Sequence, residues 1–110
     1  MRVIKPDAEK TREPKQYDLE DRTFSFAKDV RAFARHIPRT IANIEDTKQV
    51  VRASGSVGAN YIEANESLSK KDFLMRIKIC RKEAKECRYW LQLIEAGDDS
   101  NLEKTKSVLI

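Results

Sequence analysis

The chain has little of what breaks a helix. Its 110 residues include three glycines and three prolines, and charged residues make up 36% against 40% apolar. This balance favours a helical domain over a disordered chain or a many-stranded sheet. At this length there is room for one modest core and therefore for one domain. No run approaches the roughly 18 consecutive apolar residues of a membrane span, and no secretory signal is recognisable, so we expect a cytoplasmic protein without membrane contact.

The two cysteines and the single histidine exclude the common metal and disulfide chemistries. Cys80 and Cys87 would lie about 10.5 Å apart along one helix, too far for a disulfide, and we interpret both as core residues in a reducing compartment. They also lack the CxxC spacing of a zinc site. A di-iron bundle needs two Glu-x-x-His motifs, whereas His36 is the only histidine and belongs to none. No metal or cofactor is expected.

Positive charge is concentrated in two segments. The net charge is +4, and residues 70–90 hold eight Lys and Arg against three Asp and Glu, while residues 21–39 hold five against two. A clustered basic surface can attract nucleic acid or another polyanion. The same pattern is equally typical of a solvated helix face that keeps a protein in solution, and both interpretations stay open.

Apolar spacing predicts a first helix over about residues 21–37 and no strand anywhere in the chain. Residues 1–20 show no apolar period and are predicted to form a flexible arm. Pro38 should end the helix, because the residue before a proline is pushed out of the helical region. The apolar stripe of this helix recurs at helical intervals, at Phe26, Val30, Phe33 and Ile37.

A second helix is expected over about residues 44–64, with Asn43 as its cap. Asn65 should end it in the left-handed conformation that asparagine tolerates. Its centre is rich in small residues and includes Gly55 and Gly58. Since glycine costs up to about 1 kcal/mol in a helix, we expect another backbone to pack closely there. The alternatives are a break into two shorter helices, or a phosphate loop, which the missing Lys and hydroxyl disfavour.

The third predicted helix runs from Ser69, capped together with Asp72, to Gly97, and a fourth, short or truncated, opens at Ser100. Plotted at 100° per residue, the third helix has one apolar arc suited to a core: Phe73, Ile77, Cys80, Ala84, Cys87, Leu91 and Ile94. A second apolar arc is predicted to be a subunit interface: Met75, Ile79, Trp90 and Leu93. The opposite, basic side carries the candidate nucleic-acid contacts: Lys78, Arg81, Lys82, Lys85 and Arg88. Tyr89 lies on that basic side and fits either base stacking or an interface.

Two carboxylates, Glu83 and Glu86, fall inside the apolar surface of the third helix. A buried charge without a partner costs several kcal/mol, so each needs a cation. The candidate members of this polar network are Arg52, Glu63, Arg76, Glu83 and Glu86. We interpret it as structural, fixing helix register or assembly, so that Glu83→Ala should disturb assembly. A general acid–base pair is the alternative.

Several short motifs recur together from Arg52 to Ile94. They are Arg52-Ala53, Ala59-Asn60-Tyr61-Ile62-Glu63, Asp72-Phe73, and Glu83-Ala84 through Glu86 to Trp90-Leu91. With the FAKDVRAFARHIP segment before them, they resemble a family of bacterial four-helix-bundle proteins first noticed in intervening sequences of 23S ribosomal RNA genes. The resemblance covers about residues 17–110. It departs where the usual glycine after the glutamate is replaced by Ala64-Asn65.

The resemblance implies an up-down bundle that commonly assembles as a ring-like homopentamer and has no enzymatic activity. A related branch comprises accessory proteins of diversity-generating retroelements, which are basic pentameric barrels that associate with nucleic acid and a reverse transcriptase. We therefore predict an all-α up-down four-helix bundle over residues 21–110, acting as a non-enzymatic, self-assembling scaffold or adaptor. The first alternative is a nucleic-acid-binding accessory protein that uses the basic side of the third helix. The second is an enzyme built around Glu63, Glu83 and Glu86.

Overall fold

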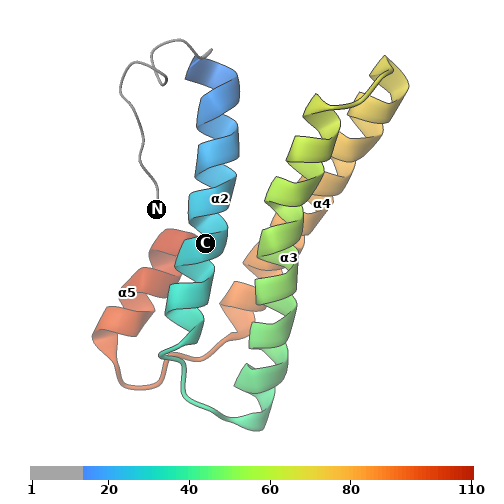
Figure 1. Cartoon of the computed structure of the whole chain (residues 1–110). Coiled ribbons are helices and arrows are strands. Elements are labelled where there is room, and N and C mark those ends of the chain that lie inside the picture. The colour runs from blue at the N-terminus through green and yellow to red at the C-terminus, as the bar shows by residue number, and fades with distance from the viewer. Residues whose placement is uncertain (1–13) are drawn as a thin grey trace.

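The computed structural model describes residues 14–110, with side chains from Leu19 onward, and these residues form four α-helices without a strand (Figure 1). The helices are α2 (Pro14–Ala34), α3 (Ile41–Asn65), α4 (Lys70–Leu93) and α5 (Ser100–Leu109). The all-α class and the short fourth helix are confirmed. Within the described residues, no helix is both long enough and apolar enough to cross a membrane.

The first helix, α2, is longer at its N-terminal end than its apolar stripe predicts. It begins at Pro14, about two turns before the expected start, so the predicted arm over residues 1–20 is wrong for residues 14–20. Proline suits the first position of a helix because its missing N–H has no intrahelical partner there. Residues 1–13 of the predicted arm lie outside the described residues. At the other end, α2 stops at Ala34 and a turn leads to Pro38.

The second helix, α3, has different caps from those expected. The hydroxyl of Thr40 accepts a hydrogen bond from the backbone N–H of Asn43 at 3.1 Å, so Thr40 is the cap and Asn43 lies in the first turn. Asn65 is not left-handed, since no non-glycine residue of the described part has a positive φ. The chain leaves the helix at Glu66 with an ordinary φ of −96°.

The glycine-rich centre of α3 stays helical and lies close to α2. The helix runs unbroken through Gly55 and Gly58, so the alternative of two shorter helices is wrong. A Cβ placed on Gly58 would lie 3.1 Å from Oγ1 of Thr23 on α2, tighter than ordinary van der Waals contact. The predicted close approach is confirmed, and α2 is the neighbour.

The third helix, α4, begins as predicted and ends earlier. The Ser69 hydroxyl accepts from the N–H of Asp72 at 3.1 Å, which confirms the cap. The helix ends at Leu93 rather than Gly97, and residues 94–99 form a loop in which Gly97 has a φ of +75°. Asp99 then caps α5, since its carboxylate accepts from two backbone N–H groups in the first turn.

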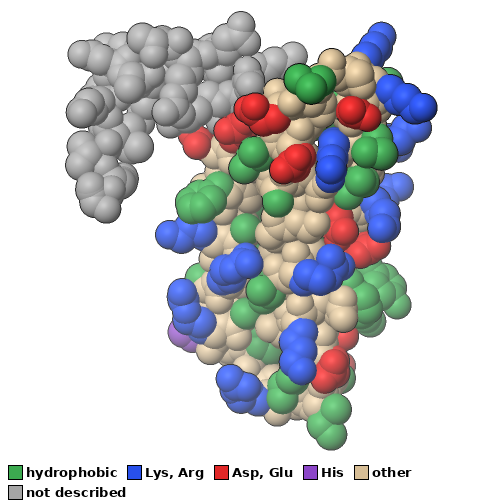
Figure 2. Space-filling view, turned by 45° about the vertical axis from the view of Figure 1, so that its right-hand side comes forward, with side chains coloured by type: hydrophobic (Ala, Val, Ile, Leu, Met, Phe, Trp, Pro, Cys, Tyr) green, Lys and Arg blue, Asp and Glu red, His purple; other side chains and the backbone are tan. Residues whose placement is uncertain are grey.

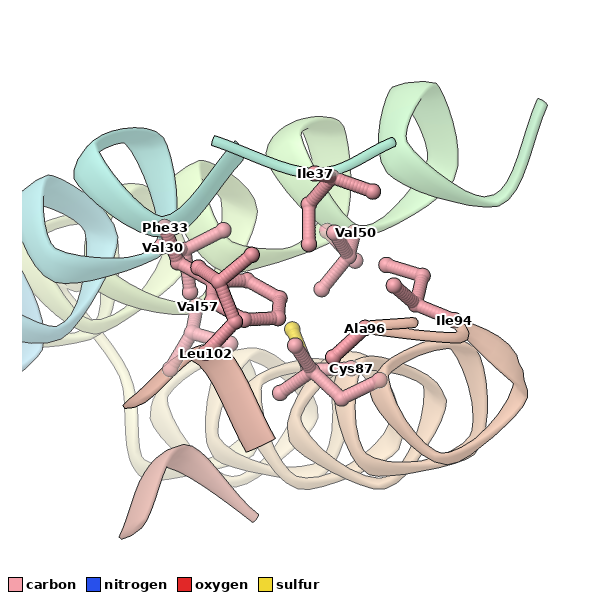
Figure 3. Close-up of a cluster of buried hydrophobic side chains, with 11 residues drawn as sticks. Val30, Phe33, Ile37, Val50, Val57, Cys87, Ile94, Ala96 and Leu102 are labelled. Carbon is pink, nitrogen blue, oxygen red and sulfur yellow. The ribbon is translucent and has the colours of Figure 1, made fainter. Parts of the chain in front are cut away.

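The hydrophobic core lies where all four helices meet, near α5. α3 packs most extensively against α4 and next against α2, while α5 contacts both α2 and α4. Figure 3 shows core side chains from all four helices and from the loop after α4 converging on one cluster. Its members are Val30, Phe33, Ile37, Val50, Ala53, Val57, Cys87, Leu91, Ile94, Ala96 and Leu102. Because α5 has only ten residues, it covers one end of the bundle, and α4 residues farther away, Phe73 and Ala84, are exposed.

Candidate interaction surfaces

A basic depression lies on α4. Four cations border a hollow of about 800 Å³ together with Glu86, Tyr89 and Trp90, and these cations are Lys78, Arg81, Lys82 and Lys85. All four are exposed, and within the described part of the chain none of them forms an ion pair. Arg88, the fifth predicted contact, is also exposed but does not line the hollow. On the face in Figure 2, Lys and Arg side chains are spread from one end of the molecule to the other.

Two adjacent aromatic side chains lie in the same hollow. The rings of Tyr89 and Trp90 meet edge to face, with centroids 5.1 Å apart and planes at 73°. Tyr89 is 56% exposed, whereas Trp90 is half-buried and packs against the core cluster. The indole N–H of Trp90 is buried without a hydrogen-bond partner, the one such side-chain atom among the described residues. Tyr89 is therefore held against Trp90 and still leaves more than half of its surface accessible to a ligand.

The predicted polar network exists in part and joins α3 to α4. Nη2 of Arg52 lies 3.4 Å from Oε1 of Glu83 and 3.4 Å from Oε1 of Glu86, as the sequence predicted. Glu83 is buried, so this contact supplies the cation that a buried carboxylate needs. Arg76 instead donates to Oδ1 of Asn60 at 3.0 Å, and Glu63 is exposed at the end of α3. The network is therefore smaller than expected.

The cysteines next to this network are not poised for chemistry. Burial, reinforced by the carboxylate of Glu83, raises the pKa of Cys87 to about 11. Burial also raises the pKa of Cys80, whose thiol donates to the carbonyl of Val57 at 3.4 Å. Because the thiolate is the reactive form, both thiols are unreactive at neutral pH. Both are free, as predicted, and the described residues contain no cluster of three or more potential metal ligands.

The predicted subunit interface forms a strip along α4, here called the α4 strip, made of Met75, Ile79, Trp90 and Leu93. Met75 and Leu93 are nearly half exposed, at 48% and 45%. Ile79 and Trp90 are half-buried within the same chain, and Trp90 packs against the core cluster. The chain thus covers the middle of the strip itself and leaves its two ends uncovered.

A groove that we did not anticipate runs between α2 and α3. It has a volume of about 480 Å³, and its walls include Phe24, Ala27, Gly55, Ala59 and Ile62, with Lys28 and Arg31 at one end. Phe24 is 65% exposed and Ile62 is 52% exposed, so large apolar side chains stand open on both helices. The small residues of α3 were the one feature of the sequence that could have indicated this groove. They leave room for the groove as well as for the close approach at Gly58.

These surfaces define an all-α bundle with one basic face and two apolar surfaces, and they contain no recognisable catalytic constellation. The protein belongs to the 23S rRNA-intervening sequence protein family, whose model matches residues 15–109. It is similar to a solved structure from Bacteroides thetaiotaomicron, described as a protein with unknown function from the S23 ribosomal protein family. The TM-score is 0.62 at 26% identity, covering 86% of this chain and 90% of that one. Neither description names an enzymatic activity.

The chain is also similar to a curated protein that carries a different description. The chain is 36% identical over 73 residues to centromere protein S of Bos taurus, across 66% of this chain and 53% of that protein. The chain thus spans about half the length of this relative.

Proposed function

We propose that the protein is a non-enzymatic scaffold or adaptor that assembles with itself into a ring, most simply the homopentamer that the family resemblance implies. The observation that carries the proposal is the presence of two separate apolar surfaces on one chain. One is the groove between α2 and α3, and the other is the α4 strip. Four large apolar side chains on these surfaces are exposed in the single chain. Covering them with a neighbouring subunit would remove apolar area from water and so stabilise the assembly. They are Phe24, Ile62, Met75 and Leu93.

Two different apolar surfaces favour a head-to-tail contact. When the patch on one subunit binds a different patch on the next, the assembly closes into a ring if the rotation allows. α2 and α4 pack on different sides of α3 and do not form a substantial contact with each other. The groove and the strip therefore belong to different sides of the subunit, as neighbours in a ring require.

Substituting glutamate at one member of each surface should give monomers. We expect Ile62→Glu to block the groove and Met75→Glu to block the strip, each reducing the mass measured by light scattering after gel filtration to that of one chain. The reason is that a buried unpaired carboxylate costs several kcal/mol, comparable to the net energy of a modest interface. The matched control is Leu68→Glu, since Leu68 is 99% exposed in the turn between α3 and α4 and lies on neither surface.

Mixing the two monomeric variants separates a head-to-tail contact from a symmetric one. Ile62→Glu retains an intact strip and Met75→Glu an intact groove, so an equal mixture should form a dimer through one native contact. A symmetric contact between identical patches would give no such rescue. Wild-type protein that is monomeric at micromolar concentration, or variants that keep the wild-type mass, would refute the proposed assembly.

A second candidate function is binding of nucleic acid by the basic depression. The observation that favours it is that Lys78, Arg81, Lys82 and Lys85 face one hollow without ion-pair partners in the described part of the chain. Basic side chains that only keep a protein in solution can be spread over its surface, whereas these four border the same hollow. Contacts of this kind go to phosphates, which position a nucleic acid without specifying its sequence.

The salt dependence of affinity tests this second function. If four phosphates are contacted on duplex DNA, log affinity should fall with log salt at a slope of about −3.6, since each contact contributes about −0.9. Replacing Lys82 and Lys85 by glutamine should reduce the magnitude of this slope by about half. Lys48→Gln is the control, because Lys48 is an exposed lysine on α3 that already pairs with Glu45 at 3.6 Å. Absence of binding at roughly 50 mM salt would exclude the function.

A further inference from the structure

Tyr89 is placed unusually for an exposed aromatic residue. It lies at one end of a row of lysines on α4, with Lys78, Lys82 and Lys85 at spacings of four, three and four residues along the same helix face. The row extends over about 16.5 Å of helix axis. A tyrosine that served only the core would turn its ring inward, whereas this ring lines the basic hollow and is 56% exposed.

Trp90 restricts the motion of the Tyr89 ring. The edge-to-face contact, at 5.1 Å between centroids, holds Tyr89 against a tryptophan that is itself packed on the core. An aromatic ring that is already oriented loses little conformational freedom when a planar ligand stacks on it. The hollow therefore combines a preformed stacking surface with unpaired cations, which is the combination found where proteins hold single strands.

We propose that the basic depression binds single-stranded nucleic acid in preference to duplex, with one base stacked on Tyr89 and the neighbouring phosphates on Lys78, Lys82 and Lys85. The proposal rests on the nucleic-acid function above and names its substrate class. A duplex keeps its bases stacked inside the helix, so Tyr89 cannot reach a base face and only the lysines would contribute. A single strand offers both its phosphates and its base faces to the same hollow.

The test compares a fluorescently labelled thymidine oligonucleotide with a duplex of the same length, measured by anisotropy at the same salt concentration. We expect Tyr89→Ala to weaken single-strand binding by roughly five- to hundredfold, the range that the loss of one stacked base produces, and to leave duplex binding unchanged. Tyr89→Phe retains the ring and should bind as the wild type does. Lys82→Gln should weaken both ligands, because it removes a phosphate contact common to them.

The outcomes distinguish this inference from the function on which it rests. Equal affinity of wild-type protein for the two ligands, or equal weakening of both by Tyr89→Ala, would overturn single-strand preference and leave nucleic-acid binding intact. Absence of binding to either ligand at about 50 mM salt would overturn both. Because Tyr89 is exposed, the alanine variant should fold as the wild type does, and an unchanged thermal melt by circular dichroism, together with retained duplex binding, checks the fold.

Discussion

Replacing Asn43 by alanine should lower the free energy of unfolding by about 2–4 kcal/mol, because three hydrogen bonds between its buried side chain and the backbone of two loops would be lost. The amide nitrogen of Asn43 donates to the carbonyl of Pro38 at 3.0 Å and to that of Glu95 at 2.8 Å. Its amide oxygen accepts from the N–H of Glu95 at 3.0 Å. One buried side chain thus joins the loop after α2, the start of α3 and the loop after α4.

Chemical denaturation followed by circular dichroism measures this loss directly. Asn101→Ala provides the control, because Asn101 is exposed in α5 and its replacement should change stability by less than about 0.5 kcal/mol. Asn43→Asp retains the acceptor for Glu95 but removes both donated hydrogen bonds, so it should not restore stability at neutral pH. A loss of under about 1 kcal/mol for Asn43→Ala would show that the loops are held by other contacts.

Leu91→Ala should cost about 3–5 kcal/mol, which is a large part of the 5–15 kcal/mol that stabilises a typical domain. Leu91 is 0% exposed and belongs to the core cluster, where Val50, Cys87 and Ile94 are also fully buried or nearly so. This loss lies in the upper part of the range for leucine-to-alanine substitutions, because residues from all four helices meet at Leu91 and cannot easily move to fill the cavity that the substitution leaves.

Leu93 is the natural comparison, since it lies two positions further along the same helix and is 45% exposed. Leu93→Ala should cost less than about 1 kcal/mol in the monomer, because much of its side chain is already in water. Thermal and denaturant unfolding of the two variants in parallel would check the prediction. Equal losses from the two substitutions would contradict the placement of the core.

Local signals made the helices of this fold predictable. The apolar stripe of α2, the Ser69 cap and the start of α5 each depend on residues within one or two turns of each other. The start of α2 could not be predicted from apolar spacing, because residues 14–20 carry no apolar period that would indicate a helix. Asn43 was misassigned because Asp46 follows it at capping-box spacing, whereas its actual partner, Glu95, lies more than fifty residues away.

The candidate surfaces also divide into those that the sequence predicts and one that it does not. The basic side and the second apolar arc of α4 belong to one helix, so residue spacing alone could define them. The contact of Arg52 with Glu83 could also be predicted, because a buried carboxylate needs a cation and Arg52 was one of the two arginines placed in the network. The groove between α2 and α3 could not be predicted from the sequence. Its two walls come from separate helices, and only the packing of these helices places Phe24 and Ile62 around the same groove.

The packing of α5 against the distant helix α2 also affects the order in which the chain folds. α3 and α4 are joined by a short turn and make the most extensive contact, so their pairing closes almost no loop. α5 must instead reach α2, with Leu102 joining Phe33 in one cluster across most of the described chain. Contacts between residues that are distant in sequence form late, since the entropy of loop closure opposes them. We therefore expect the α3–α4 hairpin to form first and the docking of α5 to complete the core last.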